Sequence, residues 1–221
     1  MAIYIDSAYL PDIQAVAQLV PLAGVTTNPT LLLNAQERGQ NLHTQEVLEH
    51  LLQQLPEPGL IFMQPPIHDE VSGYREAIAY VNTDPGRVIP KIPMTEIGLL
   101  IAQHLHAEKQ RFAFTAVTTV SQAYIAAAVG AQFIIPYYNR LRRSGIDPRE
   151  RISQMAQVLT KQQSSTRIMA ASVKSGAEAA DALIAGAHDL TVPPQVLRDM
   201  ITDPETEEAV QKFEQDRKKL H

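Results

Sequence analysis

A lysine stands near the middle of the short apolar run RVIPKIPM, residues 87–94. Lys91 is flanked by isoleucines and prolines, and no carboxylate lies within four residues on either side. Such a lysine can lie along apolar surface with its ammonium in water. Alternatively, burial lowers its pKa, and the neutral amine can then attack a ketone to form a Schiff base. The run alone allows both interpretations, so the other polar residues of the chain have to decide.

Polar side chains stand at the ends of seven of eight apolar runs along the chain. They are Asp6, Thr26, Asn28, Gln64, Lys91, Thr115, Tyr137, Arg140 and Ser172. In a barrel of alternating strands and helices, the carboxyl ends of the strands meet in one mouth, where the chemistry takes place. A barrel kept only for packing would not need this set, so the companions of Lys91 favour the nucleophile.

The elements that position these residues alternate between short apolar runs and helical patterns. Strands are expected at 2–5, 23–25, 60–64, 87–92, 112–117, 133–138, 167–172 and 188–192. Eight such units predict an α/β fold, a single-domain (β/α)8 TIM barrel. An open doubly wound sheet is the alternative, but it usually needs fewer strands at this length. No GxGxxG or GxxxxGK[ST] loop supports its nucleotide-binding versions.

Helix boundaries are marked by capping residues. The expected signals are Thr95 as an N-cap, Asp147 as an N-cap before Pro148, Ser175 and Glu178 at capping-box spacing, and Gly130 and Gly186 as stops. Each strand is expected to be followed by a helix or a loop, and no particular element is assigned between residues 29 and 56. Residues 1–202 are expected to form the barrel, and 203–221 an extra C-terminal helix. Its apolar stripe is thin, so we expect it to pack on a neighbouring subunit.

Composition narrows the function classes. The chain has 221 residues with a net charge of -5, which gives no reason to expect nucleic-acid binding. It has no cysteine, which excludes disulfides, thiolate metal sites and cysteine nucleophiles, and its histidines lack metal-ligand spacing. No signal peptide or membrane span of about 18 apolar residues is present, so a cytoplasmic protein is expected.

Six motifs resemble those of the small transaldolase family, closest to its fructose-6-phosphate aldolase branch. They are IYIDSA, LAGVTTNPTLL, IPKIPMTEIGL, FTAV, IPYYNR and AAS, and the resemblance runs from residue 2 to the C-terminal KFEQD. It implies a class I aldolase-type barrel without metal or cofactor that acts on sugar phosphates. It also implies a homodecamer of two pentameric rings, with the last helix on a neighbouring subunit.

The resemblance also implies a role for each polar residue. Lys91 would be the Schiff-base nucleophile, while Gln64, Thr115 and Tyr137 would position the water or hydroxyl that moves protons. Asp6 and Asn28 would hold hydroxyls of the ketose, with Thr26 beside them, and Arg140 and Ser172 would bind the phosphate. An arginine suits a phosphate because its planar fork presents several donors.

Two positions distinguish the reactions of this family. Gln64 and Tyr137 stand where transaldolases typically carry glutamate and phenylalanine, which favours an aldolase that cleaves fructose 6-phosphate to dihydroxyacetone and glyceraldehyde 3-phosphate. A transaldolase that transfers the dihydroxyacetone unit is the alternative, and a non-catalytic sugar-phosphate-binding barrel is a third. Arg142, Arg143 and Lys174 are interpreted as exposed charges. As the alternative, Arg142 and Arg143 would extend the phosphate site and Lys174 would add to phosphate attraction.

Overall fold

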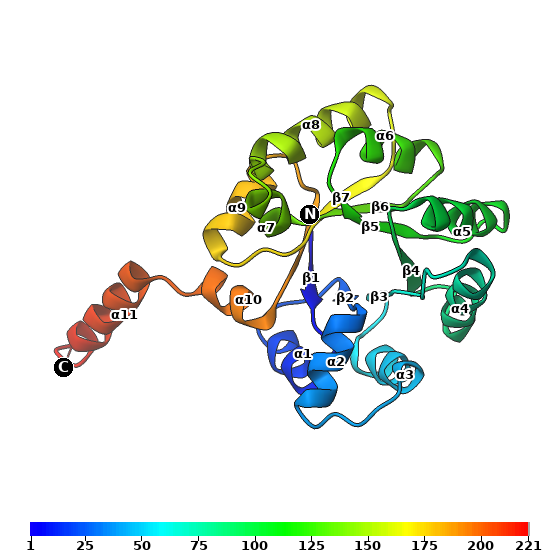
Figure 1. The fold of residues 1–221 in the computed structure, drawn as a ribbon. Coiled ribbons are helices and arrows are strands. Elements are labelled where there is room, and N and C mark those ends of the chain that lie inside the picture. Colours follow the sequence, from blue (N-terminus) through cyan, green and yellow to red (C-terminus); the bar gives the residue numbers. More distant parts are fainter. Residues whose placement is uncertain (221) are drawn as a thin grey trace.

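The computed structural model describes residues 1–220, in which eight parallel strands close into a barrel in sequence order (Figure 1). The strands are β1 (Ala2–Asp6), β2 (Gly24–Thr26), β3 (Leu60–Met63), β4 (Val88–Pro93), β5 (Ala113–Val117), β6 (Phe133–Pro136), β7 (Arg167–Ala170) and β8 (Asp189–Val192). Strand β8 pairs with β1 and completes the ring. The predicted (β/α)8 barrel is therefore confirmed, and the open sheet is wrong.

Helices surround the barrel and follow the strands (Figure 1). They are α1 (Leu10–Ala17), α2 (Pro29–Glu37), α3 (Thr44–Gln54), α4 (Glu70–Thr83), α5 (Glu96–Ala107), α6 (Val120–Ala128), α7 (Tyr138–Arg143), α8 (Pro148–Lys161), α9 (Gly176–Ile184), α10 (Pro194–Ile201) and α11 (Pro204–Arg217). The predicted N-caps Thr95 and Asp147 each accept a backbone N–H of their helix. Gly130 and Gly186 follow α6 and α9 with positive φ, as expected of helix stops.

Two helices, α2 and α3, lie between residues 29 and 56, where the sequence analysis assigned no element. Helix α2 buries only Ala35, so its sequence carries almost no apolar stripe. It is started instead by Asn28, whose side-chain oxygen accepts the N–H of Leu31 at 2.9 Å. Helix α7 was also not predicted, since FIIPYY was interpreted as strand as far as Tyr138.

Apolar side chains fill the barrel interior from the amino ends of the strands to the middle. Tyr4, Phe62 and Phe133 meet edge to face, with ring centroids 5.2 to 6.4 Å apart. At the amino ends of β7 and β8, the Arg167 guanidinium binds the fully buried Asp189 carboxylate through two hydrogen bonds of 2.6 and 2.7 Å. The interior is therefore packed below, and open space remains at the carboxyl ends of the strands.

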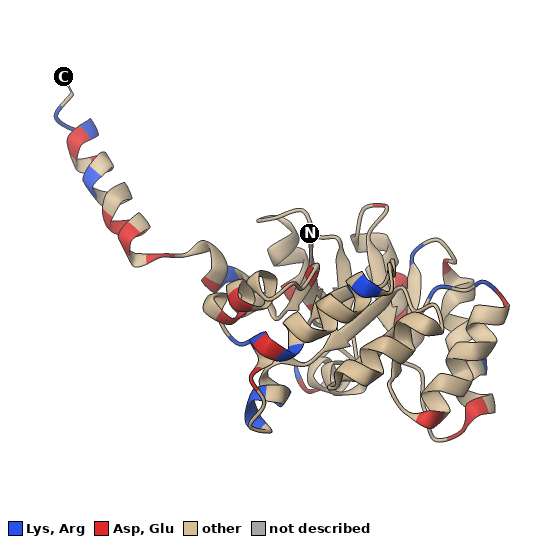
Figure 2. Ribbon diagram, turned by 90° about the horizontal axis from the view of Figure 1, so that it is seen from above, with Lys and Arg blue, Asp and Glu red and all other residues tan. Residues whose placement is uncertain are grey.

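Helix α11 projects away from the barrel (Figure 1). It begins at the N-cap Asp203 and has no buried residue, and Val210 and Phe213 are exposed. In Figure 2 the ribbon of this helix carries both acidic and basic residues along its length. In the part of the chain that the structure describes, no helix is long and apolar enough to cross a membrane.

Candidate active site

Strand periodicity brings the predicted residues to one place. In a strand, residues two positions apart face the same side. Lys91 follows Ile89 by two residues, and Thr115 follows Ala113 in the same way, and both Ile89 and Ala113 belong to the apolar cluster that fills the barrel. The same spacing relates Tyr4 to Asp6, Phe62 to Gln64 and Ile135 to Tyr137. Each of these polar groups therefore lies directly above a residue of the barrel filling.

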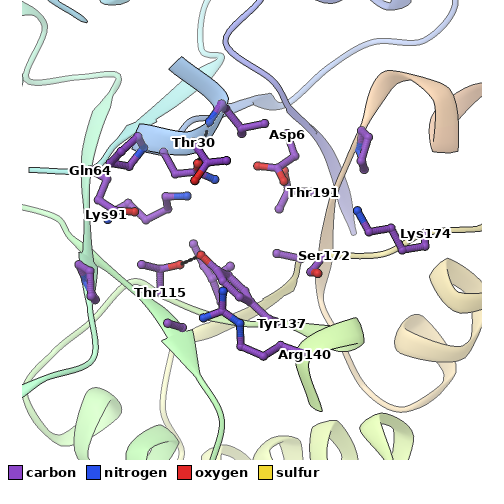
Figure 3. Close-up of a pocket in the computed structure, with 18 of the residues that line it drawn as sticks. Asp6, Thr30, Gln64, Lys91, Thr115, Tyr137, Arg140, Ser172, Lys174 and Thr191 are labelled. Atoms are coloured by element: carbon purple, nitrogen blue, oxygen red, sulfur yellow. Dashed lines mark hydrogen bonds between the residues drawn. The ribbon is translucent and has the colours of Figure 1, made fainter. Parts of the chain in front are cut away.

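The groups line a cavity of about 630 Å³ at the carboxyl ends of the strands (Figure 3). Of the nine predicted site residues, eight line it: Asp6, Asn28, Gln64, Lys91, Thr115, Tyr137, Arg140 and Ser172. Thr26 does not line the cavity and is fully buried behind it. The cavity is large enough for a sugar phosphate.

Lys91 is almost completely buried. Only 2 % of the residue is exposed, and its side chain points into the cavity (Figure 3). Burial lowers the pKa of Lys91 from 10.5 to about 8, although the nearby Asp6 carboxylate acts in the opposite direction. About one tenth of the amine is therefore neutral and nucleophilic at pH 7, far more than for a lysine with the ordinary pKa.

Asp6 faces Lys91 and is supported from behind by hydroxyl groups. Thr26 donates a hydrogen bond of 2.8 Å from its hydroxyl to Asp6 Oδ1. The hydroxyl of Thr191 in β8 lies 2.6 Å from that of Thr26. Burial raises the pKa of the Asp6 carboxyl, while Lys91, the Thr26 hydrogen bond and Lys174 act to lower it. Thr26 thus orients the carboxylate that faces the cavity.

A hydroxyl pair lies on another side of the lysine. The hydroxyls of Thr115 and Tyr137 are 2.9 Å apart, and burial raises the pKa of the Tyr137 phenol. In Figure 3, Lys91 extends between Gln64 and this pair. The Arg140 guanidinium carbon lies 4.7 Å from the centroid of the Tyr137 ring, a cation–π contact. Because burial raises the pKa of the Tyr137 phenol, the phenol stays protonated and can donate a hydrogen bond to a reacting oxygen.

Three cations border the cavity besides Lys91. Arg140, Arg143 and Lys174 line it, and Asp6 is the one acidic residue among its described lining residues. Arg143 and Lys174 are exposed, as interpreted from the sequence, yet both also border the cavity. Arg142 does not line it and instead pairs with Glu178 at 2.7 Å. This excess of positive charge suits an anionic group such as a phosphate.

The sequence analysis missed two polar residues that line the cavity, Thr30 and Thr191. Thr191 is the penultimate residue of β8, the one apolar run to which no polar group was assigned, and it lies two residues after the inward-facing Asp189. The alternation within DLTV, residues 189–192, could have placed it. Within residues 1–220, no group of three or more His, Cys, Asp or Glu side chains is arranged to hold a metal ion.

Comparison with known families decides the relationship. The model of the family described as "Transaldolase/Fructose-6-phosphate aldolase" matches residues 3–221. The chain belongs to this transaldolase/fructose-6-phosphate aldolase family. Membership confirms the resemblance at the level of the family and supports an enzyme of the aldolase or transaldolase type.

Solved structures share the barrel. A putative deoxyribose-phosphate aldolase from Coccidioides immitis superimposes with a TM-score of 0.60 at 14% identity, over 88% of this chain and 82% of that one. A mandelate oxidase variant with an FMN adduct gives a TM-score of 0.57 at 12% identity, over 88% of this chain. This chain spans 64% of the length of that oxidase. At these identities the likeness shows the fold alone.

Proposed function

We propose that this protein is a Schiff-base aldolase that reversibly cleaves fructose 6-phosphate to dihydroxyacetone and glyceraldehyde 3-phosphate. The observation that carries the proposal is the buried Lys91 amine, with its pKa lowered to about 8, pointing into a cavity that is also lined by Arg140, Arg143 and Lys174. An amine of this kind attacks a ketone, and the other cations suit the phosphate of the same substrate. Family membership supports this reaction type.

The reaction begins when the neutral Lys91 amine attacks the C2 carbonyl of the ketose. The carbinolamine loses water to give an iminium, which accepts the electron pair of the C3–C4 bond as the proton of the C4 hydroxyl leaves. Glyceraldehyde 3-phosphate departs, the enamine takes a proton at C3, and water hydrolyses the iminium to release dihydroxyacetone. The iminium itself accepts the electrons, so the proposed steps require no metal ion or cofactor.

Proton transfer in this scheme uses the groups nearest Lys91. Gln64, Thr115 and Tyr137 would hold a water molecule that carries protons to and from the substrate, because the Thr115–Tyr137 pair can donate and accept. Asp6 and the Nδ2 group of Asn28 would bind ketose hydroxyls. Asn28 Oδ1 is already used by the N–H of Leu31, which fixes the direction of that amide.

The phosphate would lie beside the cations that border the cavity. Arg140 and Ser172 would bind it directly, and Arg143 and Lys174 would add positive charge at the rim. Thr26 would act on the substrate through Asp6, since it is buried behind that carboxylate.

Tyr137 is the reason to place the aldolase before a transaldolase. Its hydroxyl can donate a proton to the reacting centre and so promote hydrolysis and release of the three-carbon unit, which a phenylalanine cannot do. A transaldolase would form the same intermediate but retain it until a second aldose arrives. It remains the second candidate because the family model covers both reactions.

A pair of assays separates the two reactions. Fructose 6-phosphate is supplied with and without erythrose 4-phosphate, and glyceraldehyde 3-phosphate is measured. We expect product without the acceptor, and we expect Tyr137→Phe to lower this acceptor-free release more than the transfer reaction. Product that appears only with the acceptor would identify a transaldolase.

A binding protein without catalysis makes a different prediction. In that case the wild type has no turnover, and Lys91→Met should keep its affinity for sugar phosphates. A Schiff-base enzyme should instead lose essentially all turnover on this substitution.

The assembly and location are also part of the proposal. We propose a homodecamer of two pentamers in which residues 203–221 pack on a neighbouring subunit, since α11 contacts so little of its own barrel. Phosphorylated sugars as substrates fit a cytoplasmic enzyme.

A further inference from the structure

Glu178 of α9 makes contacts that its capping pattern does not explain. The residue is only 8 % exposed. Its N–H donates to the N-cap Ser175 Oγ at 3.2 Å, which is one half of the predicted capping box. The return bond to the N-cap backbone does not form. Glu178 Oε2 instead accepts the backbone N–H of Lys174 at 2.8 Å.

The same carboxylate reaches across to the short helix α7. Its Oε2 accepts a hydrogen bond of 2.5 Å from Asn139 Nδ2, and its Oε1 accepts one of 2.7 Å from Arg142 Nη1. A buried carboxylate is costly unless it is paired and hydrogen bonded, and here both oxygens are used. Glu178 therefore joins α7 to the loop that follows β7.

The joined segments carry the two residues proposed to bind phosphate. Asn139 also donates to the carbonyl oxygen of Ser172, from its backbone N–H at 3.3 Å and from Nδ2 at 3.0 Å. Ser172 has a φ of 58°, the left-handed region that a serine rarely adopts. Arg140 lies in α7, which spans only Tyr138–Arg143 and is too short to be stable alone.

We propose that Glu178 is a positioning residue that sets the spacing between Arg140 and Ser172 and so determines the preference for phosphorylated substrates. It pairs with Arg142, and in doing so it leaves Arg140, Arg143 and Lys174 as the cations that border the cavity. This inference rests on the proposed function, because it assigns a determinant of the phosphate end of that same site.

The test compares two aldehydes in the synthetic direction with dihydroxyacetone. For Glu178→Ala we expect kcat/KM for glyceraldehyde 3-phosphate to fall by about 10- to 100-fold, mainly through KM, because a small displacement of binding groups has effects of that size. The constants for unphosphorylated glyceraldehyde should stay unchanged. Glu178→Gln should lie between, since its amide oxygen can still accept the Lys174 N–H but carries no charge opposite Arg142.

An acid on the neighbouring helix α8 provides the control. Glu150 accepts a hydrogen bond of 3.1 Å from Gln154 of its own helix and lies outside the cavity lining, so Glu150→Gln should leave both aldehydes unaffected. Thermal unfolding of each variant checks that it is folded. Equal losses for both aldehydes in a folded Glu178→Gln protein would indicate a purely structural role and overturn the proposal, as would no loss for either aldehyde.

Binding of inorganic phosphate gives a readout that needs no turnover. Calorimetry should show weaker phosphate binding to Glu178→Ala and Glu178→Gln than to the wild type. Unchanged binding would overturn the positioning role. A wild type that binds phosphate but turns over neither aldehyde would instead contradict the proposed aldolase and leave Glu178 judged by the calorimetry alone.

Discussion

Burial and charge act in opposite directions on Lys91. Loss of water disfavours the ammonium, while the Asp6 carboxylate favours it, and burial is the larger effect. The balance sets the pKa of Lys91 at about 8. Near neutral pH, part of the amine is therefore deprotonated and can attack the ketone, while groups nearby stay protonated and can help to expel water. Packing around the amine, rather than a general base beside it, supplies the activation.

The rate of Schiff-base formation should follow this pKa. Below about pH 7, the second-order rate constant should fall by about tenfold per pH unit, because the neutral amine is lost, and above about pH 9 it should level off. Asp6→Asn removes the charge that raises the pKa of Lys91, so the midpoint should move below 8. A midpoint near the ordinary lysine value of 10.5 in the wild type would contradict the account.

Among the secondary-structure elements, the packing of α5 against the end of β4 helps to fix the position of Lys91. Helix α5 starts very close to the end of β4, and Gly98 makes this possible. A Cβ built on Gly98 would lie 2.1 Å from the carbonyl oxygen of Pro93 and 3.1 Å from Ile92 Cγ2. A backbone oxygen cannot move aside as the end of a flexible side chain can, so the helix itself would have to shift.

Gly98→Ala should therefore be destabilising. We expect a loss of about 1 to 3 kcal/mol in urea unfolding, the usual cost of overpacking, together with lower turnover as the end of β4 moves. Gly176→Ala is the matched control at the start of α9, where the nearest atom to the new Cβ is 3.4 Å away. That variant should change stability by less than about 1 kcal/mol. Equal effects of the two substitutions would refute the close-approach argument.

The elements that the sequence predicted are those with a strong local signal. Strands such as LIFMQ are continuous apolar runs, and caps such as Thr95 and Asp147 precede clear helical stripes, so both were placed within a few residues. Helix α2 was missed because it buries only Ala35, and its start depends on Asn28, which was read as a substrate ligand. Local pattern alone does not reveal a helix held by its cap.

The site was predictable where a polar residue ends an apolar strand and less so where distance in sequence intervenes. Thr191 escaped because its alternation within β8 was read as a continuous run. Arg143 and Lys174 are exposed and also border the cavity, and only the closed barrel brings them to the same cavity as Arg140. The use of Glu178 across α7, in place of a complete capping box, required the tertiary structure.

At the scale of the whole molecule, the barrel and α11 are held together by little within the protomer. Deletion of residues 203–221 should leave the barrel folded, because α11 buries no residue against it. It should also give smaller particles, since exposed Val210 and Phe213 are then no longer available to a neighbouring subunit. Sedimentation measures the particle mass and circular dichroism the fold. A truncated protein with an unchanged number of subunits would show that α11 does not hold the assembly together.

The central claim is that Lys91 is the nucleophile, and trapping tests it most directly. The protein is incubated with fructose 6-phosphate, reduced with borohydride, digested and analysed by mass spectrometry. We expect one ketose-derived adduct, on the peptide that contains Lys91, and none in Lys91→Met. An adduct on Lys174, which also lines the cavity, or no adduct at all, would contradict it.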